Sequence, residues 1–170
     1  MKGTKRLAVL AMFTAIALTI FVAEAQIPPI VPIPGVKLGL ANIVTLIAMA
    51  LLGRRQAGEI LLVRIVLGSM FTGGVSAMLF SIAGGVFAYL IMCLTIRHFP
   101  ERLLWVVSVL AAFGHNAGQL LVAVWVTGTP SILVYAPALV AASVITGAFT
   151  GAAAMYLVRA LRKTGHFPQT

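Results

Sequence analysis

Seven polar residues lie within or beside the long apolar runs of this sequence, where ionisable groups are rare. Ionisable side chains at membrane depth are costly and usually face a cavity or a partner, so these residues are candidates for ligand binding. With a rise of about 1.5 Å per helical residue their depths agree with one another, and we expect all of them to line one outward-opening cavity. They are Glu24, Lys37, Asn42, Arg64, His115, Asn116 and Gln119.

Three of these residues belong to the motif "GHNAGQ". His115 and Gln119 are four residues apart and share one helix face, whereas Asn116 is turned by about 100° and would line an adjacent wall. Amide and imidazole groups can donate or accept hydrogen bonds, so the motif predicts a recognition surface. The alternative for this motif, and for Asn42, is a set of interhelical hydrogen bonds that only hold the bundle together.

Arg64 lies inside the apolar stretch "EILLVRIVLGSMF" and must be paired or solvated there. Its planar guanidinium suits a carboxylate or phosphate. One alternative is a structural ion pair with Glu24, which would leave Lys37 as the unpaired charge at the cavity mouth. Otherwise Lys37 and Arg64 make the cavity positive, and the ligand should carry negative charge.

Residues for catalysis or metal binding are few. The sequence has no aspartate, and its glutamates, Glu24, Glu59 and Glu101, lie on separate segments, so no carboxylate pair is predicted to hold Mg²⁺. There is no GxxxxGK[ST] phosphate loop, and the single Cys93 belongs to no zinc-type Cys/His grouping. We expect no enzymatic activity, metal or cofactor.

The composition is that of an integral membrane protein. Of 170 residues, 61% are hydrophobic and 9% are charged, and the mean hydropathy is +1.10, whereas soluble domains carry about 25% charged residues. The net charge of +9 comes from short basic clusters between apolar runs, which indicate membrane topology and not nucleic-acid binding.

The apolar runs predict an all-α bundle of six transmembrane helices in one domain spanning residues 1–170. A crossing needs about 20 residues, so the short second and third runs could be tilted, broken or re-entrant. The expected helices are residues 7–27, 38–53, 60–71, 75–96, 103–127 and 132–158.

Basic residues concentrate in cytoplasmic loops, and this rule places both termini on the cytoplasmic side. We expect a multi-pass protein of a prokaryotic cytoplasmic membrane. Lys37 and Arg64 are the two basic residues that this assignment does not place on the cytoplasmic side. One alternative is that residues 1–25 form a cleavable leader ending in a small-x-small site. The ten residues assigned to the cytoplasmic side are Lys2, Lys5, Arg6, Arg54, Arg55, Arg97, Arg102, Arg159, Arg162 and Lys163.

A proline-rich bridge, "IPPIVPIPGVK", follows the first apolar run on the expected outer side. Proline restricts φ and removes backbone donors, while glycine allows a hinge, so the bridge is predicted to be a semi-rigid lid over the cavity. The alternative is a merely rigid external loop. The lid residues are Pro28, Pro29, Pro32, Pro34 and Gly35.

Two helix faces carry small residues. Ala11 and Ala15 are four apart in the first run, and Ser143, Gly147 and Gly151 repeat this spacing in the last. Such faces let helices pack closely, usually within the same protein, and the alternative is docking of a partner.

Four stretches, in the order "VPIPGVKLGLANIVTLIAM", "RIVLGSMF", "SIAGG" and "GHNAGQLLVA", resemble the family called Gx transporters, often labelled heptaprenyl diphosphate synthase component I. That family is similar to the S-components of energy-coupling factor transporters. The resemblance implies six helices with both termini inside and no ATP site. It also implies that Ala11 and Ala15 dock on a transmembrane coupling protein, and that residues 28–36 close over the ligand.

The expected function is therefore a substrate-binding membrane subunit. It would capture a small, anionic nutrient or cofactor precursor from outside, with a transmembrane coupling protein and separate ATPase subunits as partners. One alternative is a non-catalytic membrane accessory of polyprenyl diphosphate or quinone synthesis. Another is a structural subunit of a membrane redox assembly.

Overall fold

The computed structural model describes residues 3–27, 37–72, 74–165 and 167. In this part of the chain every regular element is a helix, as expected. Two short 3₁₀ helices, η1 (Glu101–Leu103) and η2 (Pro130–Tyr135), lead into the last two long ones. The α-helices are α1 (Gly3–Glu24), α2 (Asn42–Leu51), α3 (Arg54–Thr72), α4 (Gly74–Thr95), α5 (Leu104–Thr127) and α6 (Ala136–Lys163).

Four segments of the described chain are long and apolar enough to cross a membrane: α1, α4, η1 with α5, and η2 with α6. Helix α2 has 10 residues, or roughly 15 Å, about half of a bilayer core. Helix α3 has 19 residues but contains four charged ones. The described part of the chain is thus all-helical and has the helices of a membrane protein, and the count of six crossings stays a prediction.

Helix α3 is longer than the apolar run of residues 60–71 indicated, because its first turns are polar. Glu59 in these turns is 3.1 Å from Arg6 Nη2 of α1 and 3.3 Å from Arg55 Nε. Helix α6 likewise runs past residue 158 to Lys163, where basic side chains favour the negative end of the helix dipole. Apolar runs therefore understate helices whose ends leave the hydrocarbon.

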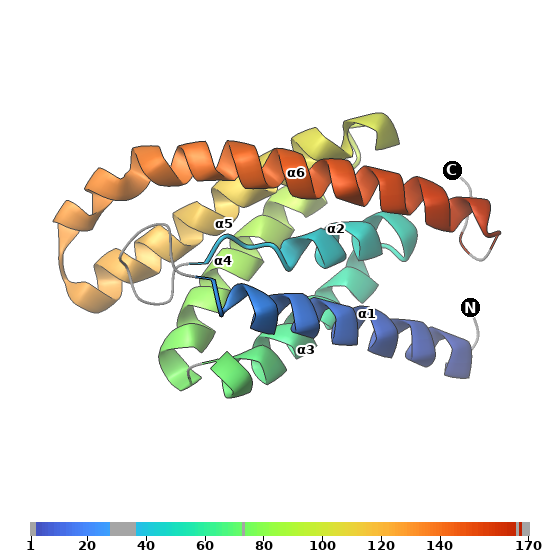
Figure 1. Cartoon of the computed structure of the whole chain (residues 1–170), viewed down its shortest axis with the longest axis horizontal. Helices are drawn as coiled ribbons and strands as arrows, with labels where there is room; N and C mark the ends of the chain where they lie inside the picture. The colour runs from blue at the N-terminus through green and yellow to red at the C-terminus, as the bar shows by residue number, and fades with distance from the viewer. Residues whose placement is uncertain (1–2, 28–36, 73, 166, 168–170) are drawn as a thin grey trace.

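Both termini lie at the same end of the bundle, together with the α2–α3 and α4–α5 turns (Figure 1). The α3–α4 and α5–α6 turns lie at the opposite end (Figure 1). The ion pair of Arg162 with Glu101, 2.9 Å long, joins α6 to η1 at the terminal end. This arrangement agrees with termini on one side of the membrane, whichever side that is.

Small residues allow α5 to lie close to α4 and α6. A Cβ added to Gly118 would be 2.7 Å from the Ala83 carbonyl oxygen of α4. One added to Gly147 or Gly151 of α6 would lie 2.6 Å from Val109 Cα or 2.4 Å from Trp105 Cα of α5. The small face of α6 therefore serves internal packing, as such faces usually do.

The orientation of the bundle can be tested by cysteine labelling in a Cys93→Ala background. Thr129 is exposed and follows Gly128, whose left-handed conformation caps α5, so Thr129→Cys avoids straining the cap. We expect an impermeant maleimide added to intact cells to label Thr129→Cys, and to label Gln56→Cys only after permeabilisation. Labelling of Gln56→Cys alone in intact cells would contradict the assignment.

Candidate functional site

Six of the seven predicted polar residues meet where the end of α1 and the segment before α2 approach α3 and α5. All of them except the half-buried Lys37 are buried, and the Arg64 side chain is only 2% exposed. Ser81 of α4 lines the same space. We call the six residues the polar cluster: Glu24, Lys37, Asn42, Arg64, His115 and Gln119.

Asn42 connects the cationic and imidazole groups of the cluster. Its Oδ1 accepts a hydrogen bond from Arg64 Nη2 at 3.4 Å, and its Nδ2 donates to His115 Nδ1 at 3.1 Å. A His115 Nδ1 that accepts puts the proton of the neutral ring on Nε2. Arg64 Nε is buried and has no hydrogen-bond partner in the described part of the chain. The backbones of Lys37 and Gly84 lie beside the His115 ring, so Arg64 Nε is the donor that a ligand oxygen could accept from.

Residues 37–39, which we call the strap, are tied to the cluster through their backbone. The Lys37 N–H donates to Gln119 Oε1 at 3.1 Å, and the Gly39 N–H donates to Glu24 Oε1. The strap is thus hydrogen-bonded both to α1 and to α5. It links these two helices beside the cluster.

The His115 ring lies between two glycines. A Cβ added to Gly39, whose φ is +78°, would be 2.7 Å from His115 Cδ2, and one added to Gly84 of α4 would be 2.6 Å from Cε1 and Nδ1. Any side chain at either position would displace the imidazole. Both glycines are therefore steric requirements of the cluster.

Phe21 receives both cations of the cluster on its ring. Lys37 Nζ is 3.7 Å and Arg64 Cζ is 5.4 Å from the ring centroid, and such cation–π contacts offset part of the cost of burial. No ion pair joins Arg64 to Glu24 among the described residues, whose ion pairs involve Glu59 and Glu101. One carboxylate and two basic side chains give the cluster a formal excess of one positive charge.

The space inside the cluster is small. Its volume is about 10 Å³, which is close to the least that holds one water molecule. A ligand larger than water therefore requires movement of the strap or of the side chains around it.

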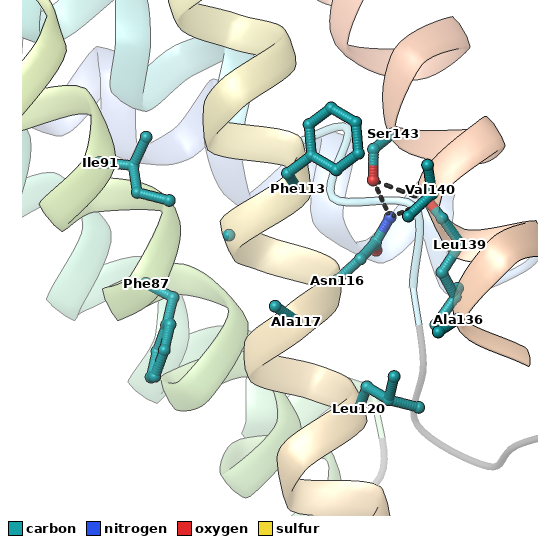
Figure 2. A pocket seen from close by; sticks show the side chains of 11 residues that line it. Phe87, Ile91, Phe113, Asn116, Ala117, Leu120, Ala136, Leu139, Val140 and Ser143 are labelled. Carbon is teal, nitrogen blue, oxygen red and sulfur yellow. Dashed lines mark hydrogen bonds between the residues drawn. The ribbon is translucent and has the colours of Figure 1, made fainter. Parts of the chain in front are cut away.

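Asn116 lies outside the polar cluster. Its Nδ2 donates to the Leu139 carbonyl at 3.1 Å and to Ser143 Oγ at 2.7 Å, both on α6 (Figure 2). It lines a separate apolar groove of about 370 Å³ between α4, α5 and α6. Asn116 thus makes interhelical hydrogen bonds, which was the alternative interpretation of the motif. The reason is that a rotation of about 100° from His115 places it on another face of α5.

The remaining predicted positions fall into two groups. The expected lid residues, Pro28, Pro29, Pro32, Pro34 and Gly35, lie outside the described residues. Ala11 and Ala15 are exposed on α1.

Sequence reasoning missed Phe21, Gly39 and Gly84. Phe21 precedes Glu24 by three residues and so shares its helix face, a signal that was present in the sequence. Gly39 and Gly84 stand in "KLGLAN" and "SIAGG", but nothing in the sequence alone pairs them with His115.

A protein-family model described as Heptaprenyl diphosphate synthase component I matches residues 13–157. The chain belongs to this family. The match includes every residue of the polar cluster, and it confirms the family resemblance of the four motifs. No curated protein and no solved structure matches the chain. Within the heptaprenyl diphosphate synthase component I family, the similarity to S-components is therefore a hypothesis from the motifs alone.

Gly39→Ala should open the cluster, and Gly128→Ala is its control. Both glycines have positive φ, +78° and +63°, but a Cβ at Gly128 would meet nothing within 4 Å. We expect the free energy of unfolding of each variant to fall by about 1 to 2 kcal/mol because of backbone strain. For Gly39→Ala the free energy of unfolding should fall by roughly 1 kcal/mol more, because the added methyl group displaces His115 and weakens its hydrogen bond with Asn42. Thermal unfolding of the purified variants in detergent measures this, and equal losses would contradict the steric role of Gly39.

The relation of Arg64 to Glu24 can be tested with a double-mutant cycle. Arg64→Gln should destabilise by about 1 to 2 kcal/mol through loss of its contacts with Phe21 and Asn42. Because Glu24 bonds the strap and not Arg64, adding Glu24→Gln should give no rescue. Thermal unfolding of the wild type, both single variants and the double variant completes the cycle. Recovery of wild-type stability in the double variant would establish a structural ion pair.

Proposed function

We propose that this chain is a non-catalytic membrane subunit of a polyprenyl diphosphate synthase assembly. The observation that carries this proposal is the family match over residues 13–157, because the words "component I" imply a further component. The catalytic step would belong to that other component. The apolar helices would hold this subunit in the bilayer.

The carboxylates of the chain support a non-catalytic role. The sequence has no aspartate. Glu24 accepts from the strap, Glu59 contacts Arg6 and Arg55, and Glu101 contacts Arg162. In the described residues, His, Cys and acidic side chains do not gather in a group that could hold a metal ion. Carboxylates committed separately in this way do not form the pair that would bind Mg²⁺ with a diphosphate.

The polar cluster supports ligand binding by this subunit. It has one excess formal positive charge and a buried donor, Arg64 Nε, that no described residue uses, with the His115 ring beside it. A carboxylate or phosphate oxygen matches this donor, and guanidinium binds such groups well. We infer that the ligand carries a small anionic group.

A second candidate is an S-component of an energy-coupling factor transporter. The exposed positions of Ala11 and Ala15 on α1 favour it, because a small-residue face on an outer helix can admit another helix closely. The polar cluster would then capture a small anionic nutrient or cofactor precursor. A transmembrane coupling protein and ATPase subunits would complete the transporter.

Affinity purification of the tagged chain from its native membranes separates the two candidates. We expect a soluble prenyl diphosphate synthase subunit to copurify. Recovery of ATPase subunits with no prenyl synthase would contradict the first candidate and favour the second. Mass spectrometry of the bound fraction identifies the partners in one measurement.

The paired change Ala11→Leu and Ala15→Leu then tests the face on α1. The control is Ala138→Leu with Ala141→Leu, which adds the same side chains at exposed positions of α6. If α1 docks a coupling protein, the α1 variant should lose that partner in the same pull-down and the α6 control should keep it. Unchanged recovery with the α1 variant would remove the docking role.

A further inference from the structure

The apolar groove between α4, α5 and α6 is a second cavity with its own chemistry. Its volume of about 370 Å³ lies within the range of roughly 300 to 1,000 Å³ typical of ligand pockets. None of its lining residues is charged. It is also separated from the polar cluster by α5, since His115 and Asn116 point to different faces of that helix.

The groove opens at the outer surface of the helix bundle. Phe87 of α4 and Val140 of α6 flank it and are 42% and 48% exposed, and Ala117 on its floor is exposed too. Figure 2 shows α5 between the flanking helices, with Phe87 and Ile91 on one side and Val140 on the other. A molecule dissolved in the bilayer can therefore enter sideways, without passing the polar ends of the bundle.

The groove contains one hydrogen-bond acceptor that no described residue uses, on the side chain of Asn116. Asn116 is 5% exposed, and its Nδ2 donates to both Leu139 O and Ser143 Oγ. The Ser143 hydroxyl donates to Leu139 O at 2.7 Å, so its proton is also committed. What is left is Asn116 Oδ1, to which no described residue donates. An amide oxygen can only accept, so a ligand must bring an O–H or N–H donor.

We propose that this groove binds a neutral, membrane-dissolved alcohol with a long apolar chain, whose hydroxyl donates to Asn116 Oδ1. The uncharged lining disfavours a phosphate or carboxylate at this depth, because a buried ion without a partner is costly. The exposed apolar walls suit the chain, and the single acceptor suits one hydroxyl. The site depends on neither candidate function of the polar cluster.

The experiment uses the full chain in phosphatidylcholine nanodiscs with a photoreactive long-chain fatty alcohol as the probe. Unlabelled alcohol and its methyl ether compete separately, and the ether keeps the chain but lacks the donor. We expect saturable labelling at the groove, and competition by the ether about three- to tenfold weaker, the effect of one hydrogen bond in a membrane protein. Because only the ligand is changed, folding of the protein does not enter this comparison.

A matched pair of variants locates the site. Ala117→Phe fills the groove from an exposed position, whereas Ala141→Phe adds the same ring at an exposed position of α6 that does not line it. We expect labelling to fall at least tenfold in Ala117→Phe and to be unchanged in Ala141→Phe. Equal loss in both variants, or no loss in either, would overturn the location.

Two further results would overturn the proposed occupant. Equal competition by the alcohol and the ether would mean that the groove is filled by any lipid chain and recognises no hydroxyl. Disulfide-linked dimers of Ala117→Cys in a Cys93→Ala background, at a yield above that of Ala141→Cys, would mean that a second copy of the chain covers the groove.

Discussion

Burial of the Arg64 charge constrains how helices α1, α2 and α3 meet in this bundle. An arginine that is 2% exposed needs compensation from its surroundings, since its charge cannot be removed by deprotonation. The ring of Phe21 and the amide oxygen of Asn42 supply contacts from α1 and α2. Helices α1, α2 and α3 must therefore meet at this depth, and Lys37 and Gly39 of the strap line the same space as the charge.

Helix α5 divides the interior into two regions of different chemistry. One face presents His115 and Gln119 to the polar cluster. Asn116, which follows His115 in the sequence, turns to α6 and the apolar groove. Glycines on α5 and α6 make this possible, since Gly118 of α5 meets the α4 backbone, and Gly147 and Gly151 of α6 meet the α5 backbone, too closely for a Cβ. The polar cluster and the apolar groove thus lie on different faces of one helix.

The helical content and most of the polar cluster could be predicted from the sequence, because apolar runs and charges at membrane depth have few explanations. The start of α3 could not, since its charged first turns look like a loop until Glu59 is seen beside Arg6. Asn116 was assigned with its neighbours because a helical phase angle does not say which helix packs on each face. The roles of Gly39 and Gly84 depend on their contacts with His115, which lies about 76 and about 31 residues farther along the chain. No local sequence pattern encodes contacts over such separations.

The strap has an energetic consequence for any ligand of the polar cluster. Opening the cluster breaks the hydrogen bonds of Lys37 N–H to Gln119 and of Gly39 N–H to Glu24, together about 2 to 4 kcal/mol if one acceptor is charged. The open form would then be a minor population, and the observed affinity would be weaker than the intrinsic affinity by about 30- to 1,000-fold. A partner that favours the open strap would raise ligand affinity by up to that factor without touching the ligand. By reciprocity, a bound ligand would tighten the hold of that partner.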